Sequence, residues 1–367
     1  MSALLVLYLA ALSLAHLGGL GPLRYAIIAG VIGLILAAYK GAFISNSFSY
    51  NAGGIIIFAG GAMATLSSGL AMSAAYFVFM LINYLLYPAF AKVKVKPIHL
   101  QLFAVYLIGT LALVRGFGRG QINNFYGNPN NYATVVLCSS YIGMLAFYRQ
   151  RFLQLLLAPV FLLFVFLSSS RTQLAAMVLF LGLFFTQRYI LRTHLRRSLT
   201  IALIFMFLLY ATLITGDPYD IIGTVQELTV GHKSYRGLSY RDVLFFTSVD
   251  ILEEHPYGVG WGQSAYYIQR ETGQLLSPHN TFMKVAVEGG WSAMVGYGIL
   301  LLGMLYNCRS ALASSFIIAM SLRALFESAT PFTLSFVSAM LIVPFFLNEL
   351  TVEGAPEVTA VPVPTPT

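Results

Sequence analysis

Long apolar runs separated by short polar connections make up most of the chain. A helix that crosses a membrane needs about 20 mostly apolar residues, and about twelve segments have this character. The segment 51–67 is short and rich in glycine, and 311–327 is interrupted by Arg323 and Glu327, so a count of about eleven spans is the alternative. The predicted spans are 2–17, 22–39, 51–67, 70–90, 98–115, 129–148, 152–169, 172–190, 198–215, 280–306, 311–327 and 331–348. The pattern predicts an all-α polytopic membrane protein.

Composition supports this fold class. Of the 367 residues, 58% are hydrophobic and 9% are charged, whereas a soluble domain carries about 25% charged residues. The net charge is +8, but the basic residues stand singly or in small groups between apolar runs. Because no basic face or tail is present in the sequence, we expect no nucleic-acid partner. The apolar N-terminus lacks a basic start and a cleavage site, which indicates a first span rather than a removed signal peptide.

The distribution of basic residues predicts the orientation. If the N-terminus is cytoplasmic, the loops on that side hold 11 Lys and Arg residues, and the short loops on the opposite side hold four. Cytoplasmic loops of membrane proteins carry the excess of Lys and Arg. The bias therefore places residues 216–279 outside and both termini in the cytoplasm.

This orientation divides the chain into four parts. Residues 1–215 form nine N-terminal transmembrane helices, 216–279 form one large outer loop, 280–350 form three further spans and 351–367 form a disordered tail. Eight of the 13 acidic residues lie between Asp217 and Glu271, and none precedes Asp217. Structureless loops longer than about 15 residues are usually functional, so the outer loop is the predicted working surface.

Within this loop, residues 240–254 have helical apolar spacing at Val243, Phe246, Val249 and Ile251/Leu252. The spacing predicts an amphipathic helix on the membrane surface. The glycine-rich segment 255–262 follows. Such a turn either lets backbone N–H groups approach an anion or simply ends the helix.

Several polar residues stand next to apolar spans. His279 lies where the chain re-enters the membrane, where it can accept a proton, or it can be a polar residue at a helix start like its neighbour Asn280. Arg171 directly precedes a long apolar helix, an expensive place for a charge unless it has a function or reaches the headgroups. Arg236 and Arg241 bind lipid phosphate or, together with Arg171, clamp a diphosphate.

Four segments together resemble a known family. They are NPNNYA (128–133), SSSRT (168–172), RDVL to EEHPYGVGWG (241–262) and HNTFMKVAVEGG (279–290). In this order, within residues 125–295, they resemble the bacterial O-antigen polymerase and O-antigen ligase superfamily. Each motif is degenerate, so their order carries the resemblance.

The resemblance implies a GT-C-like fold and a metal-independent glycosyltransferase without a cofactor, at the outer, periplasmic face of the inner membrane. Its donor would be a glycan on undecaprenyl diphosphate. By the same resemblance, Arg171 and Arg241, or less directly Arg236, hold the diphosphate, and His279 activates the acceptor hydroxyl. The further residues expected to contact donor or acceptor are Asn130 and Asn280.

This chemistry suits the composition, because a lipid diphosphate leaves readily once its charge is matched by cations. Metal sites usually need clustered carboxylates, and the sequence has few. Attack from the opposite face of the sugar predicts inversion at the anomeric carbon. Glu288 lies about two and a half turns beyond His279, too far to orient its ring, and is expected to be structural.

The acceptor decides between two members of the superfamily. A polymerase extends a lipid-linked repeat unit, whereas a ligase adds the glycan to lipid A core. Ligases usually carry Gly, Thr or Tyr where this chain has Ala293, and this departure favours a polymerase. A lipid-linked oligosaccharide transporter is the alternative from another class, but repeated halves, typical of transporters, are not evident. Membrane lipid is a contact, and the family pattern implies a chain-length regulator and a flippase as partners.

Overall fold

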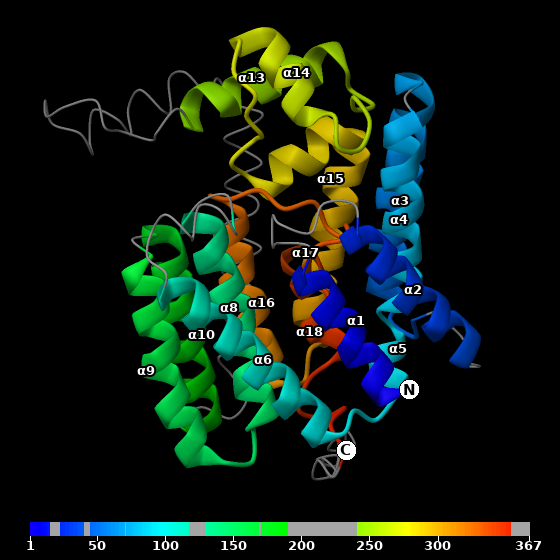
Figure 1. The fold of residues 1–367 in the computed structure, drawn as a ribbon. Coiled ribbons are helices and arrows are strands. Elements are labelled where there is room, and N and C mark those ends of the chain that lie inside the picture. The colour runs from blue at the N-terminus through cyan, green and yellow to red at the C-terminus, as the bar shows by residue number, and fades with distance from the viewer. Residues whose placement is uncertain are drawn as a thin grey trace, which may run out of the picture.

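The protein is a bundle of helices (Figure 1). The computed structural model describes residues 1–14, 23–39, 45–69, 71–116, 126, 129–168, 170–189 and 241–353. Within these ranges, every named element of secondary structure is a helix. The helices are α1 (Ser2–Leu14), α2 (Leu23–Ala38), α3 (Phe48–Ser68), α4 (Ala71–Leu86), α5 (Ala89–Lys92), α6 (Pro97–Gly116), α8 (Pro129–Ala146), α9 (Arg151–Leu167), α10 (Arg171–Tyr189), α13 (Arg241–Glu254), α14 (Ser264–Thr272), α15 (Thr281–Asn307), α16 (Ala311–Ala324), α17 (Phe336–Met340) and α18 (Val343–Phe346).

The prediction of an all-α membrane protein is confirmed for this part of the chain. Four helical stretches in the described residues are long and apolar enough to cross a membrane, namely Phe48–Ser68, Ala71–Lys92, Pro97–Arg115 and Thr281–Asn307. The predicted span 198–215 lies outside the described residues. The total number of spans and the GT-C-like fold stay predictions.

The last predicted span, 331–348, is not one helix. Its residues form the short helices α17 and α18, separated by a break after Met340. Polar side chains in this segment bond to nearby groups in place of a continuous helix: Thr333 donates to the Thr330 carbonyl and to the Ser338 hydroxyl. Such local side-chain bonds compete with helix formation. The apolar run is therefore long enough for a span, but its Thr and Ser residues interrupt the helix.

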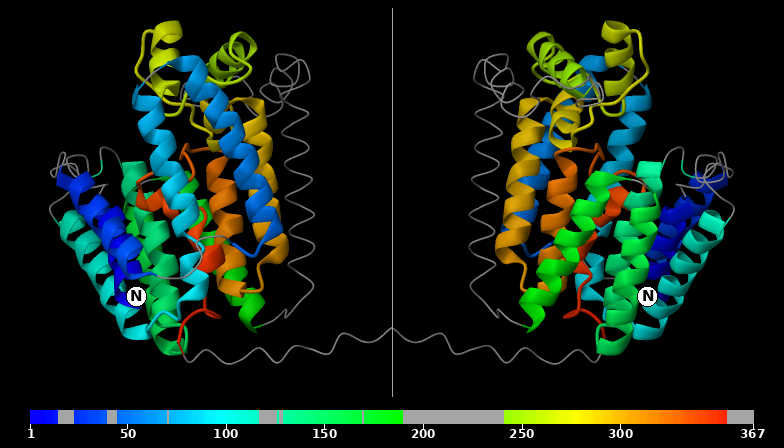
Figure 2. Two further views of the ribbon diagram at one scale, coloured as in Figure 1. Left: turned by 90° about the vertical axis from the view of Figure 1, so that its right-hand side faces the viewer. Right: turned by 90° about the vertical axis from the view of Figure 1, so that its left-hand side faces the viewer.

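Helices α3 and α15 lie in close contact along their length (Figure 2). A Cβ atom added at Gly53 would lie 2.8 Å from the Gly296 carbonyl oxygen, and one at Gly60 would lie 2.8 Å from the Gly289 carbonyl oxygen. Small residues of this kind let helix backbones approach closely in a membrane. The glycines that made 51–67 an irregular span are therefore the reason that it packs.

Helix α15 is broken at Gly290, whose backbone adopts φ 81° and ψ 175°. The break frees backbone groups at its edge, and a neighbouring loop satisfies them. The N–H groups of Val259 and Gly260 donate to the carbonyls of Val287 and Glu288 at 2.8 and 3.0 Å. A backbone group left unpaired in an apolar region costs free energy, so the loop stabilises the break.

The glycine-rich turn 255–262 is thus used for structure. Gly258, Gly260 and Gly262 all have positive φ, which glycine adopts without steric cost. A Cβ at Gly258 would lie 2.5 Å from the Gly290 nitrogen. The interpretation of this turn as an anion site needs free backbone N–H groups. Two of these, on Val259 and Gly260, are already bonded to α15.

Helices α13 and α14 form a lobe at one end of the bundle (Figure 1), called here the α13–α14 lobe. The helix predicted at 240–254 is confirmed as α13, but its buried face is rotated by one residue from the predicted one. Val243 is exposed and Phe246 is partly exposed. The buried residues of α13 are Leu244, Thr247, Ser248, Ile251 and Leu252. Contacts with α14 and α15 explain this face. No pattern in the sequence predicted α14 itself.

The opposite end of the bundle holds the beginning of the chain and the end of its described part. The Ser2 hydroxyl accepts from the Lys96 N–H at 2.9 Å. Val95 donates its N–H to the Thr351 carbonyl at 3.1 Å, and Glu353 donates to the Val95 carbonyl at 2.9 Å. These three segments lie together, away from the α13–α14 lobe (Figures 1 and 2).

Candidate active site

The loop between α14 and α15 brings His279 to the start of α15. Asn280 is the N-cap of this helix, and its side-chain oxygen accepts from the N–H groups of Phe282 (2.8 Å) and Met283 (3.1 Å). Its amide nitrogen donates to the Leu325 carbonyl at 3.1 Å. Asn280 is therefore occupied by structural bonds, whereas His279, one residue earlier, keeps 36% of its side chain exposed.

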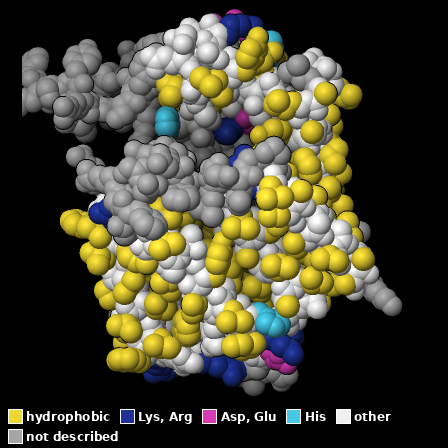
Figure 3. Space-filling model, viewed as in Figure 1, with side chains coloured by type: hydrophobic (Ala, Val, Ile, Leu, Met, Phe, Trp, Pro, Cys, Tyr) yellow, Lys and Arg dark blue, Asp and Glu magenta, His cyan; other side chains and the backbone are white. Residues whose placement is uncertain are grey.

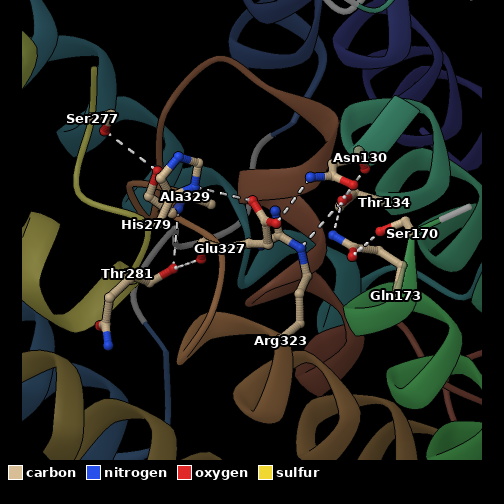
Figure 4. A network of polar contacts seen from close by, with 12 residues as sticks. Asn130, Thr134, Ser170, Gln173, Ser277, His279, Thr281, Arg323, Glu327 and Ala329 are labelled. Atoms are coloured by element: carbon tan, nitrogen blue, oxygen red, sulfur yellow. Dashed lines mark hydrogen bonds and ion pairs between the residues drawn. The ribbon is translucent and has the colours of Figure 1, made fainter. Parts of the chain in front are cut away.

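Glu327 contacts this exposed histidine. The Nδ1 atom of His279 lies 3.6 Å from Oε2 of Glu327, whose side chain is only 10% exposed. The second oxygen of Glu327, Oε1, accepts from the Asn130 side-chain amide at 3.3 Å. Figure 4 shows the carboxylate between His279 on one side and Asn130 and Arg323 on the other.

A buried polar network continues from Asn130 into the bundle. The Thr134 hydroxyl donates to the Asn130 carbonyl at 2.8 Å and accepts from Nε2 of Gln173 at 2.9 Å. The Ser170 hydroxyl donates to Oε1 of Gln173 at 2.6 Å. These bonds connect the beginnings of α8 and α10 to Asn130, which bonds Glu327 (Figure 4). Hydrogen bonds inside a buried network polarise one another and help to rigidify a site.

Arg323, in the last turn of α16, joins the same network. Its Nε donates to the Thr134 hydroxyl at 3.3 Å, and its side chain is only 3% exposed. Its Nη1 atom has no hydrogen-bond partner among the described residues. It interacts electrostatically with Glu327, four residues later. A buried cation is expensive without such a partner, so the arginine and the carboxylate support one another.

The loop that carries Glu327 is fixed to α15. The Thr281 hydroxyl donates to the Glu327 carbonyl at 2.9 Å and accepts from the Ala329 N–H at 3.0 Å. The Thr330 hydroxyl donates to Glu288 at 3.1 Å. Because Thr281 directly follows the N-cap, the same first turn of α15 positions both His279 and Glu327.

Glu288 has the structural environment that its distance from His279 predicts. Its side chain is fully buried and accepts from the Ser264 hydroxyl at 2.7 Å and from Thr330. Lys284 lies 3.9 Å away and compensates its charge. The carboxylate thus connects α14, α15 and the loop after α16.

A hollow opens beside the α13–α14 lobe in the space-filling view, and both basic and acidic side chains are visible in it (Figure 3). Charged side chains are also visible at the opposite end of the bundle, so the hollow, and not charge alone, distinguishes the lobe end (Figure 3). Among the described residues, no three His, Cys, Asp or Glu side chains are grouped so that they could hold a metal ion.

The three predicted diphosphate-binding arginines are described less fully. Arg171 is the first residue of α10, between Ser170 and Gln173 of the polar network, and Arg241 is the first residue of α13. The side chains of both lie outside the described part of the structure, as does all of Arg236. Their role stays a prediction.

The sequence analysis missed Glu327 and Arg323 as members of the site, since it treated both only as interruptions of a span. The signal was present, because ionisable residues inside a membrane segment are a functional hypothesis by default. The sequence could not show that this acid contacts a histidine 48 positions earlier.

Fold and site together define a polytopic helical membrane protein with a polar site, built around a histidine, at one end of its bundle. Residues 154–298 match a family model described as O-antigen ligase. This match confirms, for that part of the chain, the resemblance to the O-antigen polymerase and ligase superfamily. It includes Arg171, Arg241 and His279 and ends before Glu327. No curated protein and no solved structure matches the chain.

Proposed function

We propose that the protein is an O-antigen polymerase of the inner membrane that transfers a glycan from undecaprenyl diphosphate to a lipid-linked repeat unit. The family match supports glycosyl transfer from lipid-linked glycans as the general activity. The single observation that supports a mechanism is the contact between the partly exposed His279 side chain and the buried Glu327 carboxylate.

In this mechanism His279 takes the proton of the acceptor hydroxyl as its oxygen attacks the anomeric carbon. Arg171 and Arg241, with Arg236 as the alternative, match the charge that develops on the departing diphosphate. Preorganised charges of this kind commonly supply the largest catalytic contribution. Attack opposite the leaving group inverts the anomeric carbon, and no metal or cofactor takes part.

The site faces the periplasm in this proposal, and both termini are cytoplasmic. The support is that Ser2, Lys96 and Thr351 meet at the end of the bundle opposite the α13–α14 lobe. The lipid donor enters from the bilayer and the acceptor sugar from the aqueous side. A flippase and a chain-length regulator are the proposed partners.

An O-antigen ligase is the second candidate, because the matching family carries that description. Ala293, whose departure from the ligase pattern favours the polymerase, is fully buried, and its backbone nitrogen would lie 3.1 Å from a Cβ at Gly60. The structure therefore gives this position a packing role, and the acceptor is best identified by assay.

The test is transfer by the purified protein with lipid-linked repeat units, with and without lipid A core. Elongation without core supports the polymerase, and products only with core support the ligase. Movement of intact lipid-linked glycan across liposomes, without any change in its length, indicates a transporter.

Single substitutions then test the mechanism. His279→Ala should lower turnover about 10²- to 10⁴-fold, the usual contribution of a general base. Arg171→Ala should lower it about 10²- to 10³-fold. The controls are His99→Ala, since His99 bonds to Ser2 at the other end of the bundle, and Arg149→Ala, on an exposed turn. Unchanged turnover in His279→Ala and Arg171→Ala would refute the mechanism.

A further inference from the structure

We infer that Glu327 is the positioning residue of the active site: its carboxylate orients the His279 ring so that Nδ1 faces Glu327 and Nε2 faces the acceptor hydroxyl. This inference rests on the proposed function. It assigns a role to a residue outside the segment that matches the family.

The contact itself gives the direction of the ring. Nδ1 of His279, and not Nε2, is the atom 3.6 Å from Oε2 of Glu327. A carboxylate beside one ring nitrogen fixes the proton on that nitrogen and leaves the other free to accept. The distance exceeds an N–H···O bond of about 2.7–3.2 Å, and catalytic hydrogen bonds are often long before substrate binds and shorten in the complex.

Glu327 is held in place from three directions. Asn130 bonds its Oε1 atom, Thr281 bonds its backbone carbonyl, and its own N–H donates to the Arg323 carbonyl at 2.9 Å. A group that merely filled space would need none of these contacts. Since helices α8, α15 and α16 all contribute, the position of Glu327 is determined by the fold rather than by one loop.

The step balances with this assignment. The acceptor oxygen forms a bond to the anomeric carbon, and the bond between that carbon and the diphosphate oxygen breaks with its electron pair on the leaving diphosphate. The hydroxyl proton moves to Nε2 of His279. The resulting imidazolium is stabilised by Glu327, which accepts from Nδ1–H and keeps its own negative charge.

Glu349 provides a matched control, because it is also a buried carboxylate, but it accepts from the Ser310 hydroxyl at the end of the bundle away from the α13–α14 lobe. Its substitution should affect the stability of the fold without acting through His279. Comparing Glu327→Gln with Glu349→Gln therefore separates a positioning role from a structural one.

The experiment is a double-mutant cycle on transfer by the full-length protein in detergent, with lipid-linked repeat units. Glu327→Gln retains the volume and an acceptor for Asn130 but loses the charge. It should lower kcat about 10- to 100-fold, the usual range when a histidine loses its orienting partner, with little change in KM for the donor. In the His279→Ala background the same substitution should have no further effect. Glu349→Gln should change kcat by the same factor in both backgrounds.

Three results would overturn the inference. Glu327→Gln with wild-type kcat, in a protein that loses activity in His279→Ala, refutes it and leaves the proposed function intact. An equal loss from Glu327→Gln in both backgrounds assigns Glu327 a structural role. A wild-type protein that transfers no glycan refutes both proposals. If Glu327→Gln does not fold, Glu327→Asp replaces it in the cycle, and its loss of kcat should likewise vanish in the His279→Ala background.

Discussion

Asn280 and Leu325 are joined by a hydrogen bond of 3.1 Å from the asparagine side-chain amide to the leucine carbonyl. The same asparagine caps α15 through its oxygen. One side chain therefore fixes both the start of the helix that follows His279 and the loop that carries Glu327. The two halves of the candidate site are thus aligned by one uncharged side chain.

Asn280→Ala should lower the free energy of unfolding by about 0.5–2 kcal/mol, the cost of losing a side-chain cap. Asn280→Ser keeps a capping oxygen but loses the amide donor to Leu325, so it should melt above Asn280→Ala and below wild type. Thermal unfolding in detergent measures both. Gln269→Ala, at an exposed position in α14, is the control. Melting of Asn280→Ala at the wild-type temperature would contradict the prediction.

Thr281 should affect turnover through the position of Glu327. Thr281→Val keeps the shape of the side chain but removes the hydroxyl that bonds the Glu327 carbonyl and the Ala329 N–H. Left unbonded, such a buried backbone N–H costs about 1–3 kcal/mol, so the loop should shift and transfer should fall. Thr281→Ser keeps the hydroxyl and should retain transfer. Equal turnover in the valine and serine variants would show that this hydroxyl does not position the loop.

Close packing of α3 and α15 predicts a large effect from one methyl group. Gly296→Ala would place its Cβ 2.8 Å from the Gly53 carbonyl oxygen, so the helices must separate, at a cost of about 1–3 kcal/mol. Gly109→Ala is the control, because nothing lies within 4 Å of a Cβ there. The melting temperature in detergent should fall for Gly296→Ala and stay or rise for Gly109→Ala. The opposite order would exclude this packing.

Arg323→Gln tests the buried end of the polar network. It removes the charge that interacts with Glu327 and changes the donor to Thr134. Loss of a buried hydrogen-bonded group costs about 1–3 kcal/mol, so the melting temperature should fall, and transfer should fall with it. Arg309→Gln, at an exposed position between α15 and α16, should leave both unchanged. Similar melting of the two variants would argue against a structural charge at Arg323.

Much of the fold could be predicted from the sequence, because spans are defined by a long local signal. Helices α1 to α4, α6, α8 to α10, α15 and α16 correspond to predicted apolar runs. The signal was insufficient where local polar groups compete with the helix, as at Thr333 and Ser338 in the last segment. The apolar spacing also predicted the wrong buried face of α13, because that face depends on the helices that pack against α13.

The candidate site divides in the same way. His279, Asn130 and Asn280 were found in local motifs, and the structure puts all three beside Glu327 or its loop. Asn280 was expected to contact substrate, but its side chain caps a helix, which its position before an apolar run also allowed. Glu327 and Arg323 were missed as site residues because their partners are distant in sequence, and only folding brings the loop after α16 beside the start of α15.

The separation of His279 from Glu327 along the chain has a consequence for biosynthesis. Asn130, His279 and Glu327 leave the ribosome in that order, with most of the helices made before the last of the three. The histidine is therefore synthesised before the carboxylate that faces it, and a nascent chain that stops within α16 has no complete site. The ability to react would arise late in translation, after the spans that must hold the lipid donor are already in place.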